Sequence, residues 1–258
     1  MIDFDALKRK NDKFGKLSRA PIREGIIAFH HSDVVEPDVA KLDSELKLAY
    51  PNFVWESRFN VKLHGDLLQK EGNNTVHFKS EAGAAFPVGK MADRYAIQYL
   101  PAQFAVSMLA PYSHWADFKT NALEWWSKAP AKATSTQHFQ SLRFLNVLNL
   151  DLSFEDYLAK NFLHKIAGLD FELLGYTRQL AQKIKGSDYS AYTNIVFQPT
   201  TVKPEPRGRL LLDISVSNES KNKENRSNSM EIVLDEMAII KNSIFFQTLN
   251  RKAIKLCS

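Results

Sequence analysis

The chain has 258 residues, a formal net charge of +5 and 44% hydrophobic residues. This composition excludes a disordered or fibrous protein and supplies apolar side chains for one large core or two small ones. The single cysteine, Cys257, excludes an internal disulfide and favours a reducing compartment.

Residues 1–20 are basic, and we expect them to form an arm ahead of the folded part. They lack the apolar run of a signal peptide, and no other stretch is long enough to cross a bilayer, so we expect a cytoplasmic protein without a membrane partner. Because lysine and arginine neutralise phosphates, the arm is the candidate site for nucleic-acid binding. Its cations are Lys8, Arg9, Lys10, Lys13, Lys16 and Arg19. The ordinary alternative is a solvated basic surface, which also accounts for Lys241, Arg251, Lys252 and Lys255 near the C-terminus.

Residues 21–130 are expected to form a first α+β half. Apolar β-formers predict a buried strand from Ile22 to Phe29, and partial alternation predicts a half-buried strand from Phe53 to Leu63. Between them, Pro37 and an apolar stripe predict a helix that ends before Pro51. Further strands are expected at residues 76–79, 94–100 and 103–109, the last two joined by a tight hairpin at Pro101.

A helix is expected to close this half, with Ser113 as its N-cap. Its apolar stripe contains Trp115, Phe118, Ala122 and Trp126, at the spacing of one helical face. We therefore expect these side chains to face the core.

Residues 131–258 repeat this order of elements. We expect strands at residues 144–150, 171–176, 193–198 and 210–216, a helix at 153–163, and a final helix from Met230 to Leu249 capped by Asn228 and Glu231. The fold class is therefore α+β, with antiparallel sheets packed against long amphipathic helices. Two similar strand-helix-strands-helix halves and one compact domain both fit this pattern, since no residue-level repeat relates the halves.

The chemistry-bearing residues form no catalytic signature. The chain has no G-x-S-x-G nucleophile motif, and Gly89-Lys90 lacks the upstream glycine and the Ser or Thr of a P-loop. The weak metal candidates are His30, His31 and Asp33, but adjacent residues on a strand point to opposite faces. We therefore expect no catalytic residues, no metal and no cofactor.

Arg143 and Asn146 stand out as a polar pair in the apolar segment LRFLNVLNL. Buried polar groups are hydrogen-bonded or face a pocket. One interpretation is that the two residues clamp the backbone where the halves meet. The other is a binding site in which the guanidinium grips a carboxylate or phosphate with two hydrogen bonds.

Four segments together resemble a family of known sequences: PIREGIIAFHH, YAIQYLPAQFAVSMLAPYSHWADFKTNALEWW, LRFLNVLNLD and FFQTLN. In order and spacing they are similar to a sporadically distributed prokaryotic family, without an assigned activity, whose members have about this length. The most specific elements of the resemblance are Tyr112, Trp115, Arg143 and Asn146. The patchy distribution of that family implies an accessory role, such as a toxin-antitoxin pair or phage defence.

Three functions are compatible with these observations. The first is a non-enzymatic module that binds another protein, such as the product of a neighbouring gene, through Arg143, Asn146, Tyr112 and Trp115. The second is a nucleic-acid-binding protein that uses the basic arm. The third is a cryptic enzyme with a pocket near Arg143 and a histidine.

Overall fold

A computed structural model describes residues 2–15, 17–31, 44, 54–61, 80–91, 95–100, 103–112, 114–129, 138–150, 176–200, 207–219 and 229–258. Within these residues, nine strands form one sheet in which every neighbouring pair is antiparallel. The strands are β1 (Ile22–His31), β2 (Val54–Val61), β3 (Ser80–Met91), β4 (Tyr95–Leu100), β5 (Gln103–Leu109), β6 (His138–Leu150), β7 (Tyr176–Lys183), β8 (Tyr189–Thr200) and β9 (Arg207–Asn218).

The strands follow the spatial order β2-β3-β4-β5-β1-β6-β9-β8-β7. The strands β1 and β6 pair in the middle, with Ile26 opposite Arg143. On one side β1 pairs with β5, and on the other side β6 pairs with β9. In each half of the chain, the last strand therefore pairs with the first.

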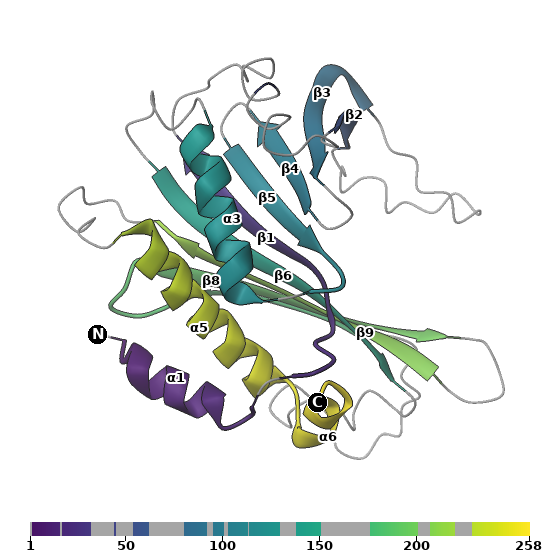
Figure 1. The fold of residues 1–258 in the computed structure, drawn as a ribbon. Helices are drawn as coiled ribbons and strands as arrows, with labels where there is room; N and C mark the ends of the chain where they lie inside the picture. The colour runs from purple at the N-terminus through teal and green to yellow at the C-terminus, as the bar shows by residue number, and fades with distance from the viewer. Residues whose placement is uncertain are drawn as a thin grey trace.

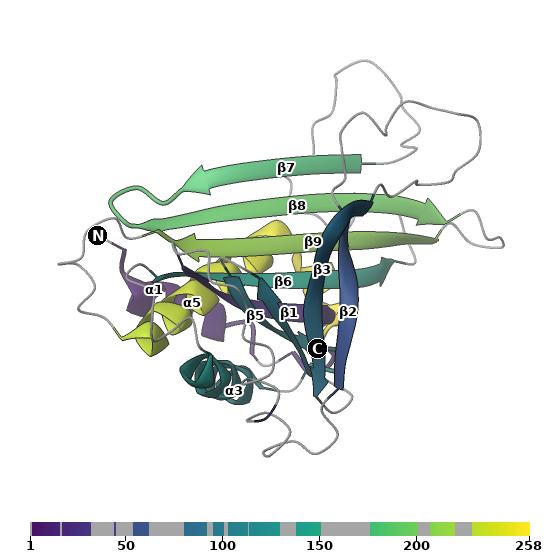
Figure 2. The same ribbon diagram turned by 90° about the horizontal axis from the view of Figure 1, so that it is seen from above.

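The described helices are α1 (Phe4–Asp12), α3 (Trp115–Lys128), α5 (Met230–Thr248) and α6 (Arg251–Leu256). The first three lie on the same face of the sheet (Figures 1 and 2). The helix α3 contacts β1 and β5, while α5 contacts β6, β9 and α1. The α+β class with an antiparallel sheet is confirmed, but there is one sheet in the described residues, and three of these helices have 14 residues or fewer instead of being long.

The core lies between the helices and the sheet. Along β6 the even-numbered side chains from Gln140 to Leu148 are buried against the helices, because alternate residues of a strand point to the same face. From α3, the ring of Trp126 stacks on Phe29 of β1 with the ring centroids 4.9 Å apart. The predicted α3 stripe is confirmed for Phe118, Ala122 and Trp126, whereas Trp115 is half-buried.

Most predicted strands are present, several of them longer than expected. The hairpin between β4 and β5 is confirmed, with Leu100 opposite Gln103. The sequence patterns missed β3 and β7, whose segments are polar or rich in small residues. Four predicted elements lie outside the described residues, Ser44 and Tyr176 excepted. They are the helices at 37–49 and 153–163 and the strands at 76–79 and 171–176.

The helix ends correct several predictions. The helix α3 begins after His114, which caps it without a side-chain hydrogen bond, and Ser113 lies outside the described residues. The N-cap of α5 is Ser229, whose Oγ accepts from the backbone N–H of Ile232, and not Asn228. The expected basic arm contains a helix, α1, because Asp3 caps it by accepting from the N–H of Ala6.

Within the described residues, no helix has both the length and the apolar content needed to cross a membrane.

Candidate functional site

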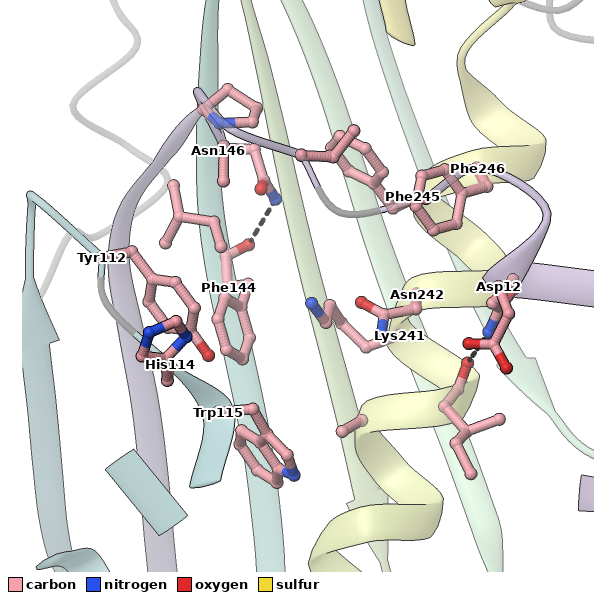
Figure 3. A pocket seen from close by; sticks show the side chains of 18 of the residues that line it. Asp12, Tyr112, His114, Trp115, Phe144, Asn146, Lys241, Asn242, Phe245 and Phe246 are labelled. Carbon is pink, nitrogen blue, oxygen red and sulfur yellow. Dashed lines mark hydrogen bonds between the residues drawn. The ribbon is translucent and has the colours of Figure 1, made fainter. Parts of the chain in front are cut away.

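A pocket of about 1210 Å³ lies where α1, α5 and the central strands meet. Its walls come from α5, from α1, from the segment between α1 and β1, from β6, and from the residues that follow β5. The lining residues that Figure 3 labels are Asp12, Tyr112, His114, Trp115, Phe144, Asn146, Lys241, Asn242, Phe245 and Phe246. This volume is sufficient for a small organic ligand.

Lys241 is the cation inside this pocket. Its side chain extends from α5 toward the ring of Phe144, with Nζ 4.0 Å from the ring centroid (Figure 3). The residue is only 9% exposed, and among the described residues no carboxylate forms an ion pair with it. Burial lowers the pKa of Lys241 to about 7. The expectation that Lys241 belongs to a solvated basic surface is therefore wrong.

Tyr112 stands beside Phe144 on the other side of the pocket. The two rings meet edge to face, with their centroids 5.5 Å apart. Burial, assisted by Tyr95 and Asp117, raises the pKa of the Tyr112 hydroxyl above its ordinary value. The hydroxyl therefore keeps its proton near neutral pH and is available as a hydrogen-bond donor.

Trp115 and Asn146 line the same pocket, but their donors are engaged. The indole Nε1 of Trp115 donates to Oδ1 of Asp235 on α5, at 2.7 Å. The amide Nδ2 of Asn146 donates to the carbonyl oxygens of Phe144 and Leu212, at 3.3 and 3.0 Å. Asn146 thus clamps the backbone between β6 and β9, and not between the two halves.

Arg143 lies on the opposite face of the sheet from this pocket. Its guanidinium donates two hydrogen bonds to Asp213 on β9, from Nε at 2.9 Å and from Nη2 at 2.7 Å. This contact, with further contributions from Glu24 and Tyr192, raises the pKa of Arg143 despite partial burial. The structure therefore brings Tyr112, Trp115 and Asn146 together and separates Arg143 from them.

We call the face that bears Arg143 the open face, since no described helix covers it (Figure 2). Strand register places one row of side chains across its centre, running through Ser107, Ile26, Arg143, Ser215 and Tyr192. The side chain of Arg143 is 51% exposed. Three of the most exposed large hydrophobic residues, at 38 or 39% exposure, also belong to the open face: Leu109, Phe139 and Tyr192.

His30 and Ser141 form a second polar contact on the open face. His30 Nε2 lies 2.9 Å from Ser141 Oγ, and the imidazole stacks on Phe139 with the centroids 4.2 Å apart. Burial and the adjacent His31 lower the pKa of His30. Because β6 is paired with β1 and with β9, the backbone N–H groups around Ser141 are engaged in the sheet and cannot form an oxyanion hole.

The metal candidates do not converge in the described part of the chain. His31 is buried on the helix-covered face while His30 lies on the open face, and Asp33 lies outside the described residues. No group of three His, Cys, Asp or Glu side chains suited to a metal ion occurs among the residues that the structure describes.

The basic segment is divided between several environments. Lys8 lines the pocket, while Arg9, Lys10 and Lys13 are exposed. The guanidinium of Arg19 donates to the carbonyl oxygen of Ser258, at 3.2 Å, and Lys16 lies outside the described residues. Three exposed carboxylates, those of Asp3, Asp5 and Asp12, are interspersed with these cations.

No protein-family model and no curated protein sequence matches the chain. The function of the pocket and of the open face is therefore inferred from their geometry and chemistry.

Sequence reasoning missed Lys241, the most unusual group of the pocket. The signal was present, because Lys241 interrupts the apolar sequence MAIIKNSIFF of the final helix. A lysine in such a stripe either extends its amine to the surface or is buried, and the periodicity does not distinguish the two.

Proposed function

We propose that the protein is a non-enzymatic interaction module that binds a partner protein across the open face of its sheet. The observation that carries the proposal is that three of the most exposed large hydrophobic side chains, those of Leu109, Phe139 and Tyr192, belong to the one face that no described helix covers. Exposed aromatic and aliphatic side chains on one surface are typical of protein-binding sites.

Over the part of the open face whose side chains the structure describes, the mixed charge supports a protein partner over a nucleic acid. The cations Arg143, Lys183 and Arg209 are accompanied there by the carboxylates of Glu24 and Asp213. Nucleic-acid binding depends on an excess of positive charge, because affinity arises largely from phosphate neutralisation. Serine, asparagine and glutamine side chains occupy much of the remaining face, which suits a partner bound by hydrogen bonds and apolar contacts.

Arg143 is suited to be the centre of this interface. Its two hydrogen bonds to Asp213 hold the guanidinium plane in one orientation, and half of the side chain remains exposed. An ordered arginine loses little conformational entropy on binding. Arginine and tyrosine are also the residues that most often dominate interface energies, and Tyr192 lies two strands away in the same row.

The proposal is tested by photo-crosslinking in cells that make the protein. A photoreactive phenylalanine analogue replaces Tyr192, and the matched control places it at Ile232, an exposed hydrophobic residue of α5. We expect one protein adduct from position 192, none from position 232, and loss of the adduct when Arg143→Ala is added. Equal labelling from both positions, or an adduct that Arg143→Ala leaves unchanged, contradicts the proposal.

The same experiment distinguishes the nucleic-acid alternative. A nuclease-sensitive adduct would indicate a nucleic-acid partner. If the binding of that nucleic acid also weakens steeply as salt rises and requires the segment from Lys8 to Arg19, the basic segment is the nucleic-acid-binding site.

The cellular role that we propose rests on the family resemblance alone. It is an accessory or defence-related role in the cytoplasm, with a neighbouring-gene product as the partner. We also propose that residues 21–130 and 131–258 are similar strand-helix-strands-helix units. The matching positions of β5 beside β1 and of β9 beside β6 support this division.

A further inference from the structure

We propose that the pocket between α1, α5 and β6 binds a small carboxylate with an apolar or aromatic body, and that the Lys241 ammonium pairs with the carboxylate. This inference is independent of the proposed function, because Phe144 and Asn146 line the pocket while Arg143, which alternates with them along β6, lies on the open face.

Lys241 brings a buried amine into the pocket, and no described carboxylate balances its charge. Its Nζ contacts the ring of Phe144. Removing an ammonium from water costs free energy unless an anion or several hydrogen bonds replace the water. A ligand carboxylate at this position would supply the missing charge.

Several walls of the pocket are apolar. Phe144 lies against the amine, and further aromatic and aliphatic side chains line the same pocket: Tyr112, Phe245, Phe246 and Ile239. They form an apolar surface for a hydrocarbon or aromatic body. The Tyr112 hydroxyl supplies a second donor, since burial keeps it protonated.

The charge balance selects a monoanion over a phosphate dianion. Lys241 is the buried cation of the pocket, and Lys8 lies exposed at its edge. The carboxylates of Asp12 and Asp235 also line the pocket and repel a second negative charge. A single carboxylate is therefore the anionic group that this set of residues accommodates best.

Binding of a carboxylate is expected to take up a proton. Burial lowers the pKa of Lys241 to about 7, so the free pocket holds mostly neutral amine at higher pH. The other titratable groups that face the pocket are Lys8 and Asp12 from α1, Tyr112 and His114 from the segment after β5, and Asp235 from α5. A carboxylate beside Nζ favours the ammonium form, which requires one proton from the solvent.

The test is calorimetric titration of the full chain with octanoate and with phenylacetate at about pH 8.5. Each titration is repeated in two buffers of different ionisation enthalpy, which measures the protons taken up. We expect at least one of the two carboxylates to bind with uptake of close to one proton, falling well below one at about pH 6. Octan-1-ol, which has the same chain without the charge, is expected to bind at least about tenfold more weakly than octanoate.

The variant Lys241→Met assigns the effect to the amine. It keeps the length and apolar character of the stem, and we expect it to bind the carboxylate about tenfold or more weakly, with no proton uptake. The matched control Lys252→Met, on the exposed side of α6, is expected to bind as the unaltered chain does.

The proposal is overturned if neither carboxylate binds, if octan-1-ol binds as tightly as octanoate, or if Lys241→Met binds unchanged. Should Lys241→Met fail to fold, the comparison of octanoate with octan-1-ol and the proton uptake of the unaltered chain decide the question.

Discussion

At the level of single residues, burial changes the acid-base chemistry of Lys241, which the amino-acid pattern does not reveal. The helix α5 places it on the face that carries Ala238 and Phe245, and that face packs toward the sheet. Contact with the ring of Phe144 favours the ammonium form, but the loss of water around the amine is the larger effect and lowers the pKa to about 7.

This shift predicts how stability changes with pH. The pKa of Lys241 is lower in the folded state than in the unfolded state, so the unfolded chain binds more protons between the two values. The destabilisation by Lys241 is therefore complete below about pH 7 and disappears as pH rises toward the ordinary lysine pKa. Near neutral pH we expect Lys241→Met to have a higher free energy of unfolding than the unaltered chain. The difference is at most on the order of 5 kcal/mol.

The measurement is urea unfolding of both proteins at about pH 7 and about pH 9.5. The stability advantage of Lys241→Met is expected to shrink at the higher pH. An advantage that stays constant between the two pH values would show that Lys241 does not titrate in this range.

At the scale of elements, one carboxylate joins two helices. Asp235 of α5 accepts from Trp115 Nε1 and, at 2.8 Å, from Lys119 Nζ, both on α3. Glu231, one turn earlier on α5, accepts from the same Lys119 Nζ at 3.0 Å. These contacts connect α3, which packs on β1 and β5, to α5, which packs on β6 and β9, within the one helix layer.

Removing the two carboxylates is expected to have unequal effects. Asp235→Ala leaves the half-buried Trp115 and the buried Lys119 without their shared acceptor, and we expect a loss of about 1–3 kcal/mol in the free energy of unfolding. Glu231→Ala, the matched control, removes a carboxylate that is 63% exposed, and we expect a loss of less than about 1 kcal/mol. Urea unfolding measures both, and equal losses would contradict the central role of Asp235.

At the scale of the whole molecule, the sheet is continuous across the boundary between the two predicted halves. The pairing of β1 with β6 joins residues of 21–130 to residues of 131–258, and Phe144 of β6 contacts Phe118 of α3. Shared strands and a shared core couple the unfolding of the two parts.

We therefore expect both halves to unfold in one transition. All four tryptophans precede residue 130, so tryptophan fluorescence reports on the first half. The buried thiol of Cys257, which becomes reactive when it is exposed, reports on the second half. The two signals are expected to give the same urea midpoint, and separated midpoints would identify two independently folding units.

Elements with strong local periodicity could be predicted from the amino-acid pattern. The strand β1 and the helix α5 were predicted nearly to their ends, because their apolar spacing alone requires one buried face. The pattern also singled out Asn146, because a polar side chain in an apolar strand needs a specific partner. Tyr112 and Trp115 were singled out as site residues only through the family resemblance. The strands β3 and β7 escaped prediction because small and polar residues give little periodic signal.

Which of these residues meet depends on how the elements pack. The placement of Arg143 beside Asp213 depends on the pairing of β6 with β9, and the burial of Lys241 depends on α5 lying over β6. Both relations join residues that are far apart in the chain. Local periodicity fixes which side of an element is apolar, but the neighbour that covers that side is chosen by the packing of the whole sheet.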